Sequence, residues 1–248
     1  MATQSANVRW TYAERVTRSY ARSLPALHRV LSRRFPQALW MGNAARREVA
    51  LTFDDGPHPI DTPALLDVLA CQNVRATFFN TGLAYQHNHA DARALARDMV
   101  AASHQIALHG LSHQPFLHER LRPFVSGLRR LQQWVADATG SALSNFIDVR
   151  PPFGLFTNDS LAAMAGAGFR PVMWSSVPFH WHQTFDEAVD QVQRELQPGA
   201  IIVLHEGMDA GPNVVALANA VIQRARDAGY TFVTVDDMWR RQREGVCP

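Results

Sequence analysis

Two aspartates stand side by side after an apolar run in the stretch TFDDGPHP, residues 52–59. Asp, Gly and Pro are common turn residues, so taken alone this stretch could simply end a strand. Further along, the stretch HGLSH places His109 and His113 four residues apart, which is close enough for both to bind one divalent ion. A carboxylate from Asp55 would complete a set of two histidines and one carboxylate that leaves coordination positions open for water and substrate.

Asp54 stands next to this set and is not needed as a ligand. A divalent ion can lower the pKa of a bound water towards about 7 and can polarise a substrate carbonyl. The carboxylate of Asp54 could then act as the base that takes the proton of the attacking water. On this hypothesis one aspartate holds the metal ion and its neighbour accepts the proton.

These residues must be positioned by regular elements, and from Val49 onward the chain alternates between two kinds of segment. Short apolar, β-prone runs read VALTF, RATFF, QIALH, FIDV, PVMWS, AIIVLH and TFVTV. Helical candidates lie between them at about 61–72, 91–103, 119–139, 157–167, 184–196 and 212–228. The runs lack polar alternation, as expected for parallel strands that are covered on both faces. Seven such repeats predict a barrel-like or doubly wound α/β sheet.

Most of the β-prone runs end in, or are followed by, a polar or aromatic residue. These residues are Asp54, Asp55, Asn80, His109, Arg150, Trp174, Ser175, His205 and Asp236. The carboxyl ends of parallel strands meet at one face, and α/β enzymes build their active sites there. We therefore expect these side chains to converge on one rim.

The composition excludes several classes of protein. The 248 residues are 47% hydrophobic and 19% charged, which is ordinary for a globular protein. The sequence has no apolar stretch of about 18 residues or more, so no transmembrane span is expected. No secretory signal is recognisable either, and a cytoplasmic protein is therefore expected. Cys71 and Cys247 are too few for a disulfide framework or a thiolate metal site. All 24 basic residues are arginines, which excludes chemistry through a lysine Schiff base.

Residues 1–46 are predicted to form a basic amphipathic helical arm that precedes a catalytic domain at 47–248. One helical face would carry Val16, Tyr20, Leu24, Leu27 and Leu31, and the opposite face Arg15, Arg18, Arg22, Arg29 and Arg33. Pro25 is expected to divide the arm into two helices. The arm could cover the domain as a surface helix, or it could make peripheral contact with an anionic membrane. Nucleic acid is not an expected partner, because the excess of basic residues is confined to the arm and no nucleic-acid-binding motif accompanies it.

Four stretches together resemble the polysaccharide deacetylase family, also known as the NodB-homology domain or carbohydrate esterase family four. They are TFDDGP, HGLSH, RPPFG at 150–154 and IVLH at 202–205, in the order and spacing of that family. The resemblance covers about residues 47–240. It implies a distorted (β/α) barrel of about seven parallel strands, with the helical arm added at its N-terminus. It also implies metal-dependent removal of acetyl groups from sugars, commonly from N-acetylglucosamine polymers.

The resemblance also implies roles for single residues. Asp54 is similar to the family's general base, and Asp55, His109 and His113 are similar to its ligands of one divalent ion. Zinc is the first candidate for that ion, and cobalt or another divalent ion is an alternative. Arg150 would hold Asp54 in place and adjust its basicity, and His205 would be the general acid that protonates the leaving amine or alcohol. The implied residues for binding an acylated carbohydrate or aminosugar are Pro152, Phe153, Trp181 and Leu204.

The chain departs from the family pattern in one block. The family usually has Asp-x-x-Asp-Trp there, and the second aspartate pairs with the acid histidine. This chain reads VPFHW at 177–181, so both aspartates are missing. Without an anionic partner the pKa of His205 is expected to be lower, and a protonated His180 would lower it further. Glu206 and Asp236 are the alternative partners for His205.

The sequence thus predicts a hydrolase that removes an acetyl or similar acyl group from an aminosugar or polysaccharide by cleaving an amide or ester bond. One alternative is a catalytically impaired carbohydrate-binding protein of the same fold. Another is a deformylase or cyclic-amide hydrolase that acts on a lipid-linked sugar or a small amide. A glycosidase is disfavoured, because glycosidases need two carboxyl groups several ångströms apart across the scissile bond, whereas Asp54 and Asp55 are neighbours.

Overall fold

The computed structural model describes residues 28, 30–87, 89–116, 121–207 and 212–244. Within these residues each β-prone run overlaps a strand, and every strand pairing is parallel. The strands are β1 (Glu48–Asp54), β2 (Thr77–Asn80), β3 (Gln105–Leu108), β4 (Asp148–Val149), β5 (Arg170–Pro171), β6 (Ile201–His205) and β7 (Thr231–Phe232). Their order across the sheet is β5-β4-β3-β2-β1-β6, and β7 pairs with the start of β1.

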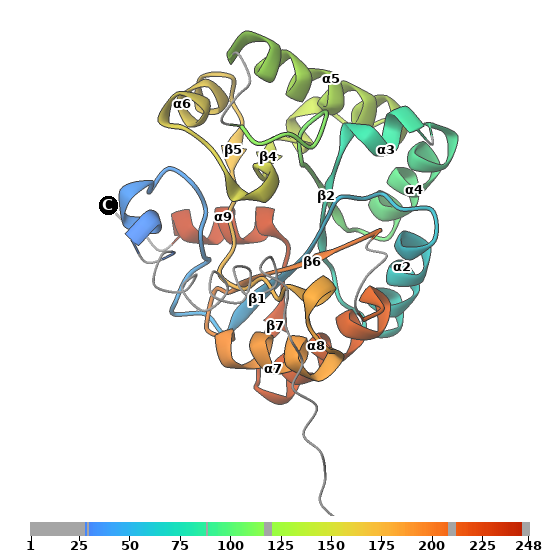
Figure 1. Cartoon of the computed structure of the whole chain (residues 1–248), viewed down its shortest axis with the longest axis vertical. Helices are drawn as coiled ribbons and strands as arrows, with labels where there is room; N and C mark the ends of the chain where they lie inside the picture. Colours follow the sequence, from blue (N-terminus) through green and yellow to red (C-terminus); the bar gives the residue numbers. More distant parts are fainter. Residues whose placement is uncertain (1–27, 29, 88, 117–120, 208–211, 245–248) are drawn as a thin grey trace, which may run out of the picture.

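Helices surround the strands, as Figure 1 shows. They are α2 (Asp61–Cys71), α3 (Gly82–His87), α4 (His89–Ala101), α5 (Leu121–Thr139), α6 (Asn158–Gly166), α7 (Phe185–Glu195), α8 (Val214–Asp227) and α9 (Val235–Glu244). Six of these match predicted segments; α3 and α9 were not predicted. Side-chain caps fix several helix starts: Thr157 and Thr184 open capping boxes on α6 and α7, and Asn213 caps α8. The predicted distorted (β/α) barrel is confirmed, and no described helix is long and apolar enough to span a bilayer.

The N-terminal segment that the structure describes is built into the barrel wall. The Leu39 N–H donates to the carbonyl of Pro171, the last residue of β5, and the Gly42 N–H donates to the carbonyl of Gly199 just before β6. In Figure 1 this blue segment lies between α6 and α7. Residues 38–42 therefore belong structurally to the barrel, although the sequence placed them in the arm. The predicted helical faces, apart from Leu31 and Arg33, fall on residues outside the described part.

Replacing Gly199 with alanine is expected to lower the free energy of unfolding by about 2 kcal/mol or more. Gly199 has φ +83°, and an added Cβ would come within 2.6 Å of the Gly42 carbonyl oxygen. A left-handed conformation costs a residue with a Cβ roughly 1–2 kcal/mol, and the contact with the backbone adds to that cost. Urea unfolding measures the change. Gly166→Ala is the control, because a Cβ at that position meets nothing within 4 Å; equal stability of the two variants would contradict the packing described.

Asp236 does not reach the rim formed by the carboxyl ends of the strands, so that prediction was wrong. Its N–H donates to Gln105 at the start of β3, and its carboxylate lies 2.8 Å from Arg170 at the start of β5. The reason is the short pairing of β7, which meets only Glu48 and Val49 at the beginning of β1. The chain is therefore still at the amino ends of the strands when α9 begins.

Candidate active site

The end of β1 places Asp54 and Asp55 in different directions. Asp54 is the last residue of the strand and is buried. Asp55 adopts φ +75°, a left-handed conformation that Asp tolerates better than most residues. Its Oδ1 lies 2.9 Å from Nε2 of His113 and 3.5 Å from Nε2 of His109. One potential ligand atom from each of these three residues lies within 4.8 Å of the others, so the predicted metal ligands are brought together.

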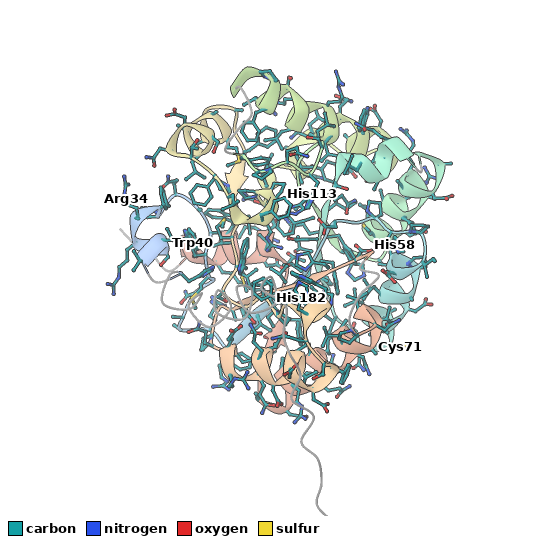
Figure 2. The ribbon with its side chains drawn as sticks, viewed as in Figure 1. Arg34, Trp40, His58, Cys71, His113 and His182 are labelled. Atoms are coloured by element: carbon teal, nitrogen blue, oxygen red, sulfur yellow. The ribbon has the colours of Figure 1, made fainter. Side chains whose placement is uncertain are left out.

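The main chain fixes the orientation of the first histidine. His109 follows β3, and its Nδ1 lies 2.9 Å from the carbonyl oxygen of Arg150. Because a carbonyl can only accept, Nδ1 carries the hydrogen and Nε2 keeps the lone pair that a metal ion needs. The second histidine, His113, has φ +51°, and its ring contacts that of Phe153 at 4.8 Å between centroids. Figure 2 shows His113 inside the ring of helices.

The electrostatics of this cluster suit a divalent cation. Burial opposes the ionisation of Asp55, but the hydrogen bond from His113 and the charges of the neighbouring histidines lower its pKa to about 2. Burial lowers the pKa of His109, so its imidazole is neutral. Burial also acts to lower the pKa of His113, but the hydrogen bond to Asp55 and the charges of Asp55 and Asp54 together outweigh it and raise that pKa. Two imidazole nitrogens and one ionised carboxylate fit the donor preference of zinc and similar ions.

Asp54 is held by a buried arginine. Its Oδ1 accepts a hydrogen bond from Nη1 of Arg150 at 2.5 Å, while its Oδ2 lies 3.8 Å from Nε2 of His109. The Arg150 side chain is fully buried against the ring of Phe79 and also donates to the hydroxyl of Thr52. Arg150 therefore orients both residues, Asp54 through its guanidinium and His109 through its carbonyl.

His205 ends β6 and is the register partner of Asp54 on β1. Burial lowers its pKa, although the charges of Asp54 and Asp55 act in the opposite direction. Its Nδ1 is buried and has no hydrogen-bond partner among the described residues. The ring of Trp181 packs edge-on against it, with centroids 4.8 Å apart.

His180 occupies the block in which the family pattern has an aspartate. It is fully buried, and its Nε2 accepts the backbone N–H of His205 at 3.2 Å. Burial lowers the pKa of His180 to about 3, so this imidazole is neutral at neutral pH. His180 thus holds the backbone of His205 without providing the negative charge that an aspartate would provide.

Neither alternative partner of His205 is in place. The Glu206 carboxyl group is buried, accepts a hydrogen bond from the Thr62 hydroxyl and packs against Gly56. Burial raises its pKa to about 8, so it is mostly neutral at neutral pH. Asp236 lies at the opposite end of the strands. Both predictions were therefore wrong.

A cavity of about 350 Å³ lies over this cluster. Its lining residues are Asp54, Asp55, His109, His113, Pro151, Phe153, Trp174, Val177, Phe179, Trp181, Val203 and His205. Phe153 and Trp181 line it as expected. Ser175, predicted at the same rim, instead uses its hydroxyl to accept the N–H of Ile201 at the start of β6.

Two predicted substrate-binding residues do not line the cavity. Leu204 is buried in the core between strands and helices, because neighbouring strand residues point to opposite faces. Val203, two residues before His205, shares its face and lines the cavity instead. Pro152 is buried near Gly110, and the preceding Pro151 takes its place. Strand periodicity counted back from His205 could have identified Val203 from the sequence.

Comparison with known proteins agrees with this geometry. The polysaccharide deacetylase family model matches residues 41–172. The chain belongs to the polysaccharide deacetylase family. Among the relatives in this family, the chitooligosaccharide deacetylase of Sinorhizobium fredii is 39% identical over 165 residues, which are 64% of this chain and 72% of that protein. The peptidoglycan-N-acetylmuramic acid deacetylase PdaA of Bacillus subtilis is 30% identical over 205 residues, covering 81% of this chain and 74% of that protein.

Solved structures of polysaccharide deacetylases have the same architecture. The structure of Bacillus subtilis PdaA, a family 4 carbohydrate esterase, superposes with a TM-score of 0.75 at 28% identity, covering 86% of this chain and 89% of that one. The Bc1960 peptidoglycan N-acetylglucosamine deacetylase also superposes with a TM-score of 0.75, at 25% identity, covering 82% of this chain and 92% of that one. The chain is therefore a deacetylase-like hydrolase of the carbohydrate esterase type.

Proposed function

We propose that this polysaccharide deacetylase removes an N-acyl group, acetyl in the simplest case, from an aminosugar oligomer by metal-dependent hydrolysis. The observation that carries the proposal is the convergence of two imidazole Nε2 atoms on one carboxylate oxygen of Asp55, with Asp54 and His205 beside them on adjacent strand ends. The substrate class is supported by relatives that are named as deacetylases of chitooligosaccharide and of peptidoglycan.

Asp55, His109 and His113 would hold the metal ion, and their donor set favours zinc. When bound, such an ion supplies Lewis acidity, which polarises the acyl carbonyl and lowers the pKa of water. The remaining chemistry falls to the side chains of this protein. In the net reaction the oxygen of water bonds to the acyl carbon, the carbon–nitrogen bond breaks, and both protons of the water pass to the nitrogen, which leaves a carboxylate and an ammonium group.

Asp54 and His205 would move the protons. Arg150 occupies Oδ1 of Asp54, so Oδ2, which faces the histidine cluster, remains to accept a proton from the attacking water. His205 lies next to Asp54 across the sheet and lines the same cavity, where it can donate a proton to the leaving nitrogen. Because burial lowers the pKa of His205, its acidic form is lost as the pH rises, and the rate of acyl release falls on the alkaline side.

His180→Asp is expected to move the alkaline limb of the pH–rate profile upward by about one pH unit. A carboxylate beside His205 stabilises its imidazolium form, raises its pKa and so preserves the acid to higher pH. His180→Asn is the control, because it offers the His205 N–H an acceptor but no charge. The profile of acyl release between about pH 5 and 8, the range in which most proteins are most stable, gives the answer. A downward or absent shift in the aspartate variant would contradict the assigned acid.

The proposed function is tested by release of acetate from an acetylated chito-oligosaccharide and from a peptidoglycan fragment. Release that stops after treatment with a chelator and returns with added zinc supports the proposal. The missing carboxylate beside His205 favours a second candidate, a carbohydrate-binding protein with impaired turnover. That candidate predicts saturable binding of the same oligosaccharides by the zinc-loaded protein without release of acetate.

A further inference from the structure

The cavity over the candidate metal site has two chemically different halves. Among the described residues, the polar side chains that line it are Asp54, Asp55, His109, His113 and His205. Its other lining residues are apolar or aromatic. Val177 and Val203 form a small buried cluster apart from the main core, and the half-buried Trp174 and Phe179 pack against it. The described lining residues therefore offer no side-chain carboxylate, amide or hydroxyl for sugar hydroxyls beyond the groups already assigned to catalysis.

Part of the apolar half lies deeper in the barrel than His205, whereas Trp174 and Phe179 are half-buried. Val203 precedes His205 by two residues on β6, so it lies about 7 Å further from the carboxyl ends of the strands. At the mouth, Phe153 is 58% exposed and its ring contacts His113. The sugar of an oligomer must remain near this mouth, because its chain continues outward on both sides. The part of the substrate that can extend below the scissile carbonyl is its acyl chain.

We propose that this pocket accepts N-acyl groups longer than acetyl, such as butyryl, with the chain seated against Val177, Val203, Trp174 and Phe179. The inference rests on the proposed function, because it concerns the acyl group that the same site would remove. An acetyl group presents one methyl group to this apolar lining, and a longer chain covers more of it. Each methylene that becomes buried is expected to raise kcat/KM about fourfold. Val177 and Val203 would set the depth of the pocket.

The test compares chitotriose carrying N-acetyl, N-propionyl or N-butyryl groups, hydrolysed by the zinc-loaded full chain. The inference expects kcat/KM to increase from acetyl to butyryl, by about tenfold or more in total. A decrease with each added methylene would overturn it and would leave the proposed function intact.

Binding to the Asp54→Asn variant, measured by calorimetry, separates the two proposals when no acyl group is released. Tighter binding of the butyryl than of the acetyl oligomer, with no turnover of either by wild type, would support the pocket and contradict the proposed function. Equal or weaker binding of the butyryl oligomer under the same condition would overturn the inference as well.

Two variants locate the effect in the pocket. Val203→Leu and Val177→Leu lengthen a side chain of the apolar half and are expected to reduce the butyryl-to-acetyl ratio of kcat/KM by about tenfold. Val177 lies in the segment that follows β5, so Val177→Leu can still test the pocket if Val203→Leu, within β6, impairs folding. Val68→Leu, on the outer helix α2, is the matched control and should leave the ratio unchanged. A preference for butyryl that persists in both pocket variants would overturn the assignment of the acyl chain to these residues.

Discussion

Asp54→Asn is expected to lower the rate of acyl release by about 10²–10⁴-fold, the usual contribution of a general base, without a loss of bound metal. The amide cannot accept the proton that Oδ2 of Asp54 would take, but it retains an oxygen to accept the hydrogen bond from Arg150. Asp54 is not among the three clustered residues that could hold a metal ion. The measurement is acetate release per bound zinc ion, with the zinc content determined on the same sample.

The neighbouring aspartate provides the matched control. Asp55→Asn removes the carboxylate that both histidines face, so it should lose metal together with activity. Asp54→Asn should lose activity alone, although the loss of a charge beside the buried Arg150 is also expected to reduce stability. Thermal unfolding shows whether each variant remains folded at the assay temperature. Wild-type rates in a zinc-loaded Asp54→Asn variant would contradict the base assignment.

Replacing His109 or His113 with glutamine is expected to weaken zinc affinity by at least about 100-fold. Loss of a group that merely orients a ligand can weaken metal binding 10–100-fold, at a rough estimate, so loss of a ligand should have the larger effect. Titration calorimetry on metal-free protein measures the change, and acyl release should fall in parallel. His182→Gln is the control, because His182 lies near the site but does not line the cavity.

Zinc binding should also weaken as the pH falls. Against the effect of burial, the hydrogen bond to Asp55 and the charges of Asp55 and Asp54 raise the pKa of His113, so zinc must displace a proton from this histidine over a wider range of pH. Fewer protons have to be displaced as the pH rises through that pKa, and the affinity increases. If His109→Gln and His113→Gln bind zinc with the same affinity as wild type, zinc binds elsewhere.

The sequence was sufficient to predict that the candidate metal ligands lie together, because two of them lie directly after parallel strands whose carboxyl ends must meet. Asp55 follows β1 and His109 follows β3, so the fold alone brings them together once the strand order is known. Arg150 was also placed correctly, although the sequence could not show that its carbonyl fixes the tautomer of His109. That contact depends on the exact register of β3 and β4.

Other predictions failed where local pattern and tertiary structure diverge. Asp236 was assigned to the rim because TFVTV resembles a full strand, but β7 pairs through only Thr231 and Phe232. Leu204 was chosen although side chains of neighbouring strand residues alternate between faces, so the correct residue, Val203, was accessible from the sequence. The hydrogen bond between His180 and the His205 backbone could not be predicted from the sequence, because it joins two segments that come together only in the folded barrel.

The most direct test of a metal-dependent deacetylase is a titration of metal-free protein with zinc, in which acetate release from an acetylated chito-oligosaccharide is followed at each addition. We predict that activity is absent at the start, rises linearly and reaches a plateau at about one zinc ion per chain, as expected for the one cluster of potential ligands among the described residues, Asp55, His109 and His113. Two results would contradict this account. One is acetate release at the full rate before any zinc is added, and the other is saturation with zinc without any acetate release.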